Sequence, residues 1–319
     1  MSKHYPVKLE NGKMKNDIRL SHDEECISFR IASHRMQLVV PAGAFAWQTL
    51  LPSFKPFECD STGVDNAMCS IRVVDQPIGI NQESAVVLNE ISGMVGHSFC
   101  LMETDQHYLI DIQFIENGSH YHMLSDKNFS TAIVYADWND VYAGIVLSTF
   151  LMFAFTQSAV LHRTLLIHAS VVEKDGEGYA FLGKSGTGKS THSALWLQYI
   201  KGAALLNDDN PAIHIEDGGV FVYGTPWSGK CPCYKNRKVR LKALIRLEQA
   251  PVNRFKWLKG VEAYVTFLPS CSSMRWNSQL FNAMCTLMEE VIANVNVGSL
   301  DCLPDKEAVY LCYEEIEKV

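Results

Sequence analysis

The sequence lacks the excess of basic residues that proteins binding nucleic acids or membrane surfaces usually carry. Its 319 residues include 28 lysines and arginines against 35 aspartates and glutamates, a formal net charge of −7. This balance argues against nucleic-acid and membrane partners. Internal repeats and low-complexity tracts are also absent, and 47% hydrophobic with 20% charged residues is an ordinary globular composition. The length predicts two domains or one large domain.

The ten cysteines lack the regular spacing of a disulfide framework. They are scattered along the chain, which is typical of reduced cytosolic thiols rather than of a small secreted scaffold. An apolar stretch is also missing after the basic residues of the first twenty positions, so we expect no signal peptide. The sequence therefore predicts a cytoplasmic protein.

One long uncharged segment, Val141–Leu161, has the length of a membrane span. Serine, threonine and glutamine side chains interrupt it, and no basic cluster adjoins either end. Helices that are apolar on all sides also occur in the core of large α/β proteins. We expect a buried core helix, packed against the sheet of the C-terminal domain, rather than a membrane span.

Two regions of different texture follow each other along the chain. In residues 1–135, short apolar runs alternate with polar turns, and His107–Ile115 places apolar residues at every second position, which predicts a β-rich accessory region. Residues 136–319 combine strand and helix patterns, which predicts an α/β domain with a mixed β-sheet. In this domain we expect strands at Leu165–Val172, Tyr179–Leu182, Ala203–Leu206, Val220–Tyr223 and Ala243–Leu247, and helices at Ser190–Ile200, Asn277–Asn294 and Asp305–Lys318.

A glycine-rich loop lies between an expected strand and an expected helix. It fits the P-loop pattern GxxxxGK[ST] at every fixed position. Glycines let backbone N–H groups curl round a phosphate, and the helix N-terminus adds positive potential. In such loops the lysine reaches the β- and γ-phosphates and the serine hydroxyl coordinates Mg²⁺, so we expect ATP and Mg²⁺ as cofactors. The expected nucleotide-binding residues are Gly183, Lys184, Ser185, Gly186, Thr187, Gly188, Lys189, Ser190 and Thr191.

A pair of aspartates, Asp208 and Asp209, ends the next apolar run. Beside a triphosphate, one carboxylate can hold Mg²⁺ and the other can accept the proton of an attacking hydroxyl. The alternatives are two solvated acids in a strand-end turn, or a Walker-B-like pair that serves ATP hydrolysis only. The aspartate pair directly follows an apolar strand, which favours a functional site over a solvated turn.

The segments LLIHASVVEKDGEGYAFLGKSGTGKSTHSALWL and LLNDDNP resemble the catalytic domain of bacterial HPr kinase/phosphorylase. That family has a histidine-bearing strand, a hairpin, a GxSGxGKS loop and an Asp-Asp pair in this order. The related phosphoenolpyruvate carboxykinases share the fold and an SGTGK loop followed by Gly-Asp-Asp. The resemblance covers residues 162–260 and is strongest over 166–211. An Asp-Gly turn before the loop implies antiparallel strands, which suits this architecture better than the parallel βαβ units of most P-loop NTPases.

The resemblance implies roles for individual residues. Lys189 and Ser190 would hold phosphate and Mg²⁺, and His168 would lie on the strand beside the active site. The aspartate pair would supply the proton acceptor. We favour Asp208 as the base and Asp209 as the Mg²⁺ partner, although the sequence alone does not assign the two. Without the resemblance, His168 would be interpreted as a core histidine.

Two stretches depart from the family pattern. Thr191 stands where the kinases usually have glutamate, and Gly224–Lys230 lacks the glutamate that helps to bind metal there. The second metal ligand is therefore unassigned, and a phosphorylase reaction is not implied. A carboxykinase would be longer and would need a set of carboxylate-binding arginines that this chain lacks.

Basic residues near this second loop are candidates for substrate contacts. Lys230 could neutralise charge on the transferred group, if Gly224–Lys230 is an active-site loop rather than a tight structural turn. Arg254 resembles the arginine of a Pro-x-x-Arg segment in the kinase family and is a candidate phosphate clamp. A run of bases is either a docking patch for an acidic or phosphorylated substrate or a solvated charged surface. It comprises Lys230, Lys235, Arg237, Lys238, Arg240 and Lys242.

Together these features predict an ATP- and Mg²⁺-dependent kinase that transfers a phosphoryl group to a hydroxyl acceptor. The acceptor would be a serine of a protein or peptide, or a small molecule, and no residue pattern distinguishes these. The alternatives are a nucleotide-binding regulatory module without transferase activity, which the missing acids favour, and a carboxykinase-like enzyme. The sequence leaves a homo-oligomer open.

Overall fold

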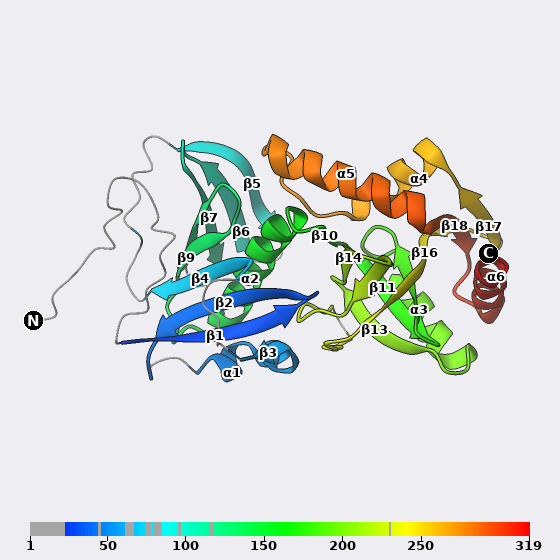
Figure 1. Cartoon of the computed structure of the whole chain (residues 1–319), viewed down its shortest axis with the longest axis horizontal. Helices are drawn as coiled ribbons and strands as arrows, with labels where there is room; N and C mark the ends of the chain where they lie inside the picture. The colour runs from blue at the N-terminus through cyan, green and yellow to red at the C-terminus, as the bar shows by residue number, and fades with distance from the viewer. Residues whose placement is uncertain are drawn as a thin grey trace, which may run out of the picture. The chain divides into compact units, whose positions relative to one another are not determined.

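The structure, a computed structural model, describes residues 23–43, 46–60, 67–74, 78, 85–94, 97–114, 118–229 and 231–319, without the side chains of 90–94 and 97. Backbone contacts divide the chain into two compact units, Met1–Ser158 and Ala159–Val319. This division falls inside a helix, whereas the predicted domain boundary follows residue 135. That boundary stays a prediction. The chain is a mixed α/β protein with large mixed β-sheets, as expected (Figure 1).

The first unit contains a mixed sheet with the strand order β3-β1-β2-β4-β9-β8-β7-β6-β5. Most neighbours are antiparallel, while β4 pairs with β2 and β9 in parallel. The short helices α1 (Trp47–Leu50) and η2 (Pro52–Phe57) follow β2. The strands are β1 (Glu24–Ile31), β2 (His34–Pro41), β3 (Glu58–Cys59), β4 (Cys69–Val74), β5 (Val86–Met94), β6 (His97–Glu103), β7 (His107–Phe114), β8 (His120–Asp126) and β9 (Thr131–Tyr135).

The long apolar segment forms helix α2 (Ala143–Val160). Among the described helices, α2 is long and apolar enough to cross a membrane, but 67% of its 18-residue window is buried, as in the core helix of a soluble protein. Phe153 contacts Phe99 of β6 and Phe129, with ring centroids 6.0 and 5.5 Å apart. These aromatic contacts lie within the first unit. Val160, the last residue of α2, belongs to the core of the second unit. The expectation that the whole helix packs against the sheet of the C-terminal domain stays a prediction.

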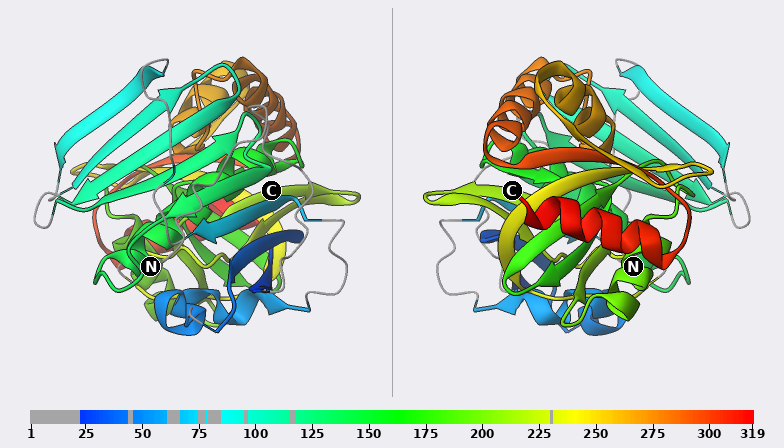
Figure 2. Two further views of the ribbon diagram at one scale, coloured as in Figure 1. Left: turned by 90° about the vertical axis from the view of Figure 1, so that its left-hand side faces the viewer. Right: turned by 90° about the vertical axis from the view of Figure 1, so that its right-hand side faces the viewer.

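The second unit is a mixed sheet with helices on both faces (Figure 2). Its strand order is β10-β14-β15-β16-β12-β11-β13, and β18 pairs with both β16 and β17. Side chains alternate along β12, so Leu182 packs under α4 and α5 while Phe181 packs under α3 and α6. A sheet buried on both faces needs apolar residues at successive positions.

The elements of the second unit carry the candidate site. The strands are β10 (Thr164–Leu166), β11 (Ala169–Lys174), β12 (Glu177–Leu182), β13 (Ala204–Asp209), β14 (Ala212–Glu216), β15 (Gly219–Tyr223), β16 (Lys238–Gln249), β17 (Arg254–Leu258) and β18 (Asn296–Cys302). The helices are α3 (Lys189–Tyr199), α4 (Gly260–Phe267), η5 (Leu268–Ser270), α5 (Ser278–Asn294) and α6 (Lys306–Glu317).

One expected strand, Leu165–Val172, is divided into β10 and β11. Between them, the backbone N–H groups of Ile167 and His168 donate outside both ladders, to the carbonyls of Pro211 and Ser270. β10 then pairs with β14, while β11 pairs with β12 and β13. His168 therefore lies at the break, immediately before β11, rather than inside a continuous strand.

Candidate functional site

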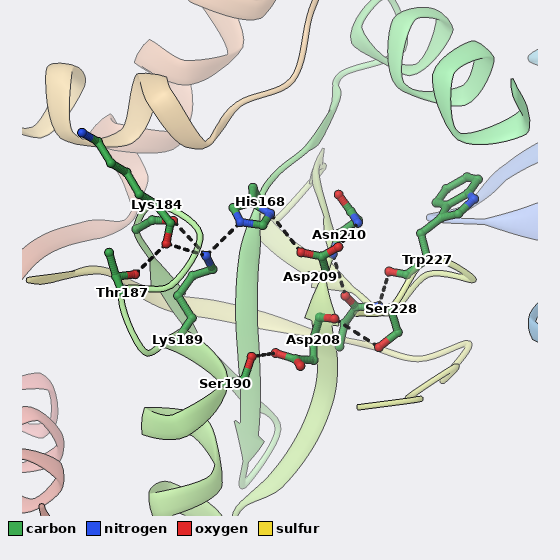
Figure 3. A network of polar contacts seen from close by, with 12 residues as sticks. His168, Lys184, Thr187, Lys189, Ser190, Asp208, Asp209, Asn210, Trp227 and Ser228 are labelled. Carbon is green, nitrogen blue, oxygen red and sulfur yellow. Dashed lines mark hydrogen bonds and ion pairs between the residues drawn. The ribbon is translucent and has the colours of Figure 1, made fainter. Parts of the chain in front are cut away.

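The glycine-rich loop, Gly183–Ser190, connects the end of β12 to the first residues of α3 (Figure 3). Gly183, Gly186 and Gly188 have φ values of 149°, 83° and 99°, which L side chains rarely adopt. A Cβ at Gly183 would also lie only 2.5 Å from the Thr187 hydroxyl oxygen. The loop therefore requires glycine. Among the expected phosphate-binding positions, Thr187 and Gly188 are half-buried, and the exposed ones are Lys184, Ser185, Gly186, Ser190 and Thr191.

Lys189 points from the first turn of α3 back into the loop. Its Nζ donates to the carbonyls of Gly183 and Lys184, at 2.9 and 3.2 Å, and lies 2.8 Å from Nε2 of His168. Lys189 is only 8% exposed. Burial lowers the pKa of its ammonium group, while the charges of Asp209 and Asp208 oppose this shift. The lysine is thus held at the inner face of the loop.

His168 connects Lys189 to Asp209 (Figure 3). Its Nδ1 lies 3.0 Å from Oδ1 of Asp209. Because an ammonium group can only donate, Nε2 accepts from Lys189, and the proton of a neutral imidazole then lies on Nδ1 and is donated to Asp209. The hydrogen bond from His168 is the main cause that lowers the pKa of the Asp209 carboxyl, and the Lys189 charge adds to it.

Asp208 takes a different partner from its neighbour. Its Oδ1 accepts a hydrogen bond of 2.9 Å from the Ser190 hydroxyl, and Asp208 is only 3% exposed. Adjacent strand residues point to opposite faces, so β13 directs Asp208 towards α3 and Asp209 towards His168. The structure thus pairs Ser190 with Asp208, whereas Ser190 and Asp209 are the expected metal ligands.

A buried polar network holds the end of β13. The side-chain amide of Asn207 donates to the carbonyls of Thr225 and Trp227, both at 3.3 Å. The N–H of Gly229 donates to the carbonyl of Asp208. The loop after β15 therefore packs against the aspartate pair. Asn207 and Thr225 are positioning residues that the sequence analysis missed; the signal for Asn207 is an amide at the end of an apolar run.

A cavity of about 690 Å³ opens beside the glycine-rich loop. Its volume lies in the range of small-molecule sites. Loop backbone and the start of α3 form one wall, and apolar side chains after β16 and β18 form another. The lining residues are Gly186, Thr187, Gly188, Thr191, His192, Gln249, Ala250, Pro251, Cys302, Leu303 and Pro304.

No protein-family profile matches the chain, and neither does any curated protein sequence. The functional assignment therefore depends on the residues and geometry of this site.

Arg254 and the basic run, as far as the structure describes them, lie apart from the contacts of the aspartate pair. Arg254 is exposed on β17 and borders another cavity, of about 540 Å³, whose lining includes neither the glycine-rich loop nor the aspartate pair. Lys230 lies outside the described residues. Much of the basic run is paired with glutamates: Lys235 and Arg237 with Glu173, Lys238 with Glu216, and Lys242 with Glu177.

Proposed function

We propose that the second unit is a cytoplasmic ATP- and Mg²⁺-dependent kinase of the HPr kinase/phosphorylase type. It would transfer a phosphoryl group to a hydroxyl acceptor on a protein, a peptide or a small molecule. One observation carries the proposal: a glycine-rich loop, its lysine, two differently partnered carboxylates and a histidine converge at one end of the sheet. The converging side chains are His168, Lys189, Ser190, Asp208 and Asp209.

The glycine-rich loop suits the phosphates of ATP, and the cavity beside it suits the nucleoside. Phosphoryl transfer depends mainly on positioning and charge stabilisation, and the left-handed glycines leave room for phosphate oxygens against the backbone. The ammonium group of Lys189 donates to two carbonyls of the loop, which holds a positive charge beside the phosphate position. The cavity next to Thr191 provides space and apolar walls for a nucleoside.

Ser190 and Asp208 fit a Mg²⁺ ion. Mg²⁺ prefers oxygen ligands at 2.0–2.1 Å in octahedral geometry, which places adjacent ligands about 2.9 Å apart. The hydroxyl and carboxylate oxygens of these residues are 2.9 Å apart. When bound, Mg²⁺ would neutralise charge on the phosphates.

We assign the base to Asp209 and the metal side to Asp208, the reverse of the assignment favoured from sequence. Asp209 is on the side of His168, and 37% of its side chain is exposed and so accessible to an acceptor. The hydrogen bond from His168 orients the carboxylate, and its lowered pKa keeps it ionised at neutral pH. A hydroxyl acceptor would transfer its proton to this carboxylate.

Lys189→Ala tests the proposal. MgATP should raise the melting temperature of the wild-type protein, because a ligand that binds only the folded state stabilises it. Lys189→Ala should lose this shift and any phosphoryl transfer, whereas Lys201→Ala, an exposed lysine after α3, should keep both. Equal shifts in wild type and Lys189→Ala would refute nucleotide binding at the loop.

The acceptor assay separates the kinase from its alternatives. Labelled ATP is incubated with candidate protein, peptide and small-molecule acceptors while phosphate release to water is measured in parallel. MgATP binding without transfer would favour a regulatory module. Turnover that depends on oxaloacetate would instead favour a carboxykinase-like enzyme.

A further inference from the structure

A separate cluster of ionisable side chains lies in the first unit, on the hairpin of β7 and β8. The carboxylate of Asp111 is placed between two imidazoles. Its Oδ2 lies 3.1 Å from Nδ1 of His120, and its Oδ1 lies 3.3 Å from Nε2 of His122. Each residue offers one donor atom, and the three donor atoms all lie within 4.8 Å of one another.

The sheet itself brings these side chains together. Asp111 on β7 is paired in register with His122 on β8. His120 precedes His122 by two positions, so both imidazoles are on the same face of the sheet. The intervening Tyr121 points to the opposite face, where it is fully buried. The three groups are thus fixed by strand pairing, which orients ligands more firmly than a loop does.

The donor set and its spacing suit a transition-metal ion. Two imidazole nitrogens with one carboxylate oxygen form a known Zn²⁺ ligand set, with a fourth position left for water. Tetrahedral ligands at 2.0–2.1 Å are about 3.3 Å apart, and Oδ1 of Asp111 lies 3.2 Å from Nδ1 of His120 and 3.3 Å from Nε2 of His122. Imidazole also disfavours Mg²⁺ and Ca²⁺, which select oxygen ligands.

Exposure agrees with such a site. The His120 side chain is 49% exposed, and the side chains of His122 and Asp111 are 18% and 21% exposed. One side of the cluster is therefore open to a metal ion and to water.

We infer that Asp111, His120 and His122 form a binding site for a divalent first-row transition-metal ion, represented by Zn²⁺, with an open position for water. The ion would bind the lone pairs of the two ring nitrogens that face the carboxylate, and a proton on either of these nitrogens would move to the other nitrogen of the ring or to solvent. This site is independent of the proposed kinase site, because it uses residues of the first unit only.

Zinc titration of the full-length protein tests the inference. After EDTA treatment and dialysis, ZnCl₂ is titrated calorimetrically in excess Mg²⁺, which occupies the oxygen-ligand site of the second unit. The wild type should bind one equivalent of zinc at this site. Asp111→Asn and His120→Ala should each lower the zinc affinity at least about tenfold, since even changes outside the ligand shell lower metal affinity 10–100-fold. The matched control is His162→Ala, an exposed histidine of the second unit, which should keep the wild-type affinity.

The cysteines do not confuse this comparison, because none of these substitutions changes a thiol. Melting temperatures in EDTA verify that each variant is folded. His120→Ala is the more tolerant substitution, because its side chain is half-exposed. Unchanged zinc affinity and stoichiometry in both site variants would overturn the inference, as would a wild type that binds no zinc. The cluster would then be an ion-pair network around Asp111 only.

Discussion

Asp208 and Asp209 are neighbours in sequence, but they differ in partner, exposure and backbone conformation. Asp208 is buried and accepts from Ser190. Asp209 accepts from His168 and has a φ of 138°, a region that costs a non-glycine residue on the order of 1–3 kcal/mol. Strained residues cluster at functional sites. Neutralising Asp208 and neutralising Asp209 are therefore expected to have different effects on MgATP binding and on transfer.

Asparagine substitutions distinguish the two roles. Asp209→Asn keeps the shape but cannot accept a proton, so transfer should fall by roughly 10²–10⁴ while MgATP affinity changes little. Asp208→Asn should weaken MgATP binding and demand more Mg²⁺. Asp217→Asn, in the exposed β14–β15 turn, is the control. Calorimetry and transfer assays measure both effects, and interchanged phenotypes would restore the assignment favoured from sequence.

His192 should make folding sensitive to mild acid. It is buried, accepts a hydrogen bond from the indole of Trp196, and burial lowers its pKa from 6.5 to about 4. Between these pH values, His192 is protonated in the unfolded chain but neutral in the folded protein. The free energy of unfolding therefore falls as the pH decreases from about 6.5 to about 4. The shift corresponds to about 3 kcal/mol at 1.36 kcal/mol per unit.

Urea unfolding between pH 7 and pH 4 measures this contribution. His192→Gln keeps a hydrogen-bond acceptor but cannot titrate, so it should lose less stability than the wild type over this window. His162→Gln, at an exposed position, should behave like the wild type. Parallel curves for the wild type and His192→Gln would contradict the buried neutral histidine.

At the scale of elements, the sequence predicted the features that depend on local patterns, namely turns and the ends of helices. The Asp-Gly turn before β12 is observed with φ values of 53° at Asp175 and 85° at Gly176, as a two-residue hairpin of type I′ requires. The helices α3, α5 and α6 begin and end within two residues of their expected bounds. In contrast, β14, β17, β18 and α4 were missed. The register that aligns Ser170 with Asp208 joins distant segments, so no local pattern predicts it.

Gly183→Ala tests the backbone of the loop. Its φ of 149° disfavours any side chain, and its Cβ would lie 2.5 Å from the Thr187 hydroxyl. We expect a stability loss of about 1–3 kcal/mol together with loss of MgATP binding. Gly202→Ala is a matched control, since Gly202 has a φ of 85° but open space around it. Urea unfolding and calorimetry compare the two variants. Wild-type stability and MgATP affinity in Gly183→Ala would contradict the requirement for glycine.

At the scale of the whole molecule, the sequence predicted a mixed α/β chain, and the structure has large mixed β-sheets together with helices. The boundary between a β-rich region and an α/β domain after residue 135 stays a prediction. The helix α2 is apolar on all sides. Because it has no polar face, its sequence does not show which side of the helix packs against a sheet. Likewise, the zinc-ligand cluster becomes visible only when β7 and β8 are paired, although His-x-His is present in the sequence.

Two lysine substitutions in α2 test whether it is a core helix. Leu151 is fully buried and Ile145 is 63% exposed. Leu151→Lys should destabilise the protein by more than about 3 kcal/mol, because it buries an unpaired charge, and Ile145→Lys should change stability by about 0.5 kcal/mol at most. Urea unfolding in detergent-free buffer measures both. Recovery of the wild type only in a detergent-extractable membrane pellet, or equal effects of the two lysines, would contradict the core assignment.

The backbone of Asp209 has a consequence for any effort to engineer heat resistance. Glycine adopts a φ of 138° without strain, and its entropic cost in the unfolded chain is only about 0.4–1 kcal/mol. Replacing this aspartate by glycine should therefore relieve the backbone strain, while it removes the carboxylate that we propose as the base and its contacts with His168 and Asn210. A screen for heat resistance at this position should therefore be coupled to an assay of MgATP-dependent transfer, because relief of strain and loss of the proposed base would occur in the same variant.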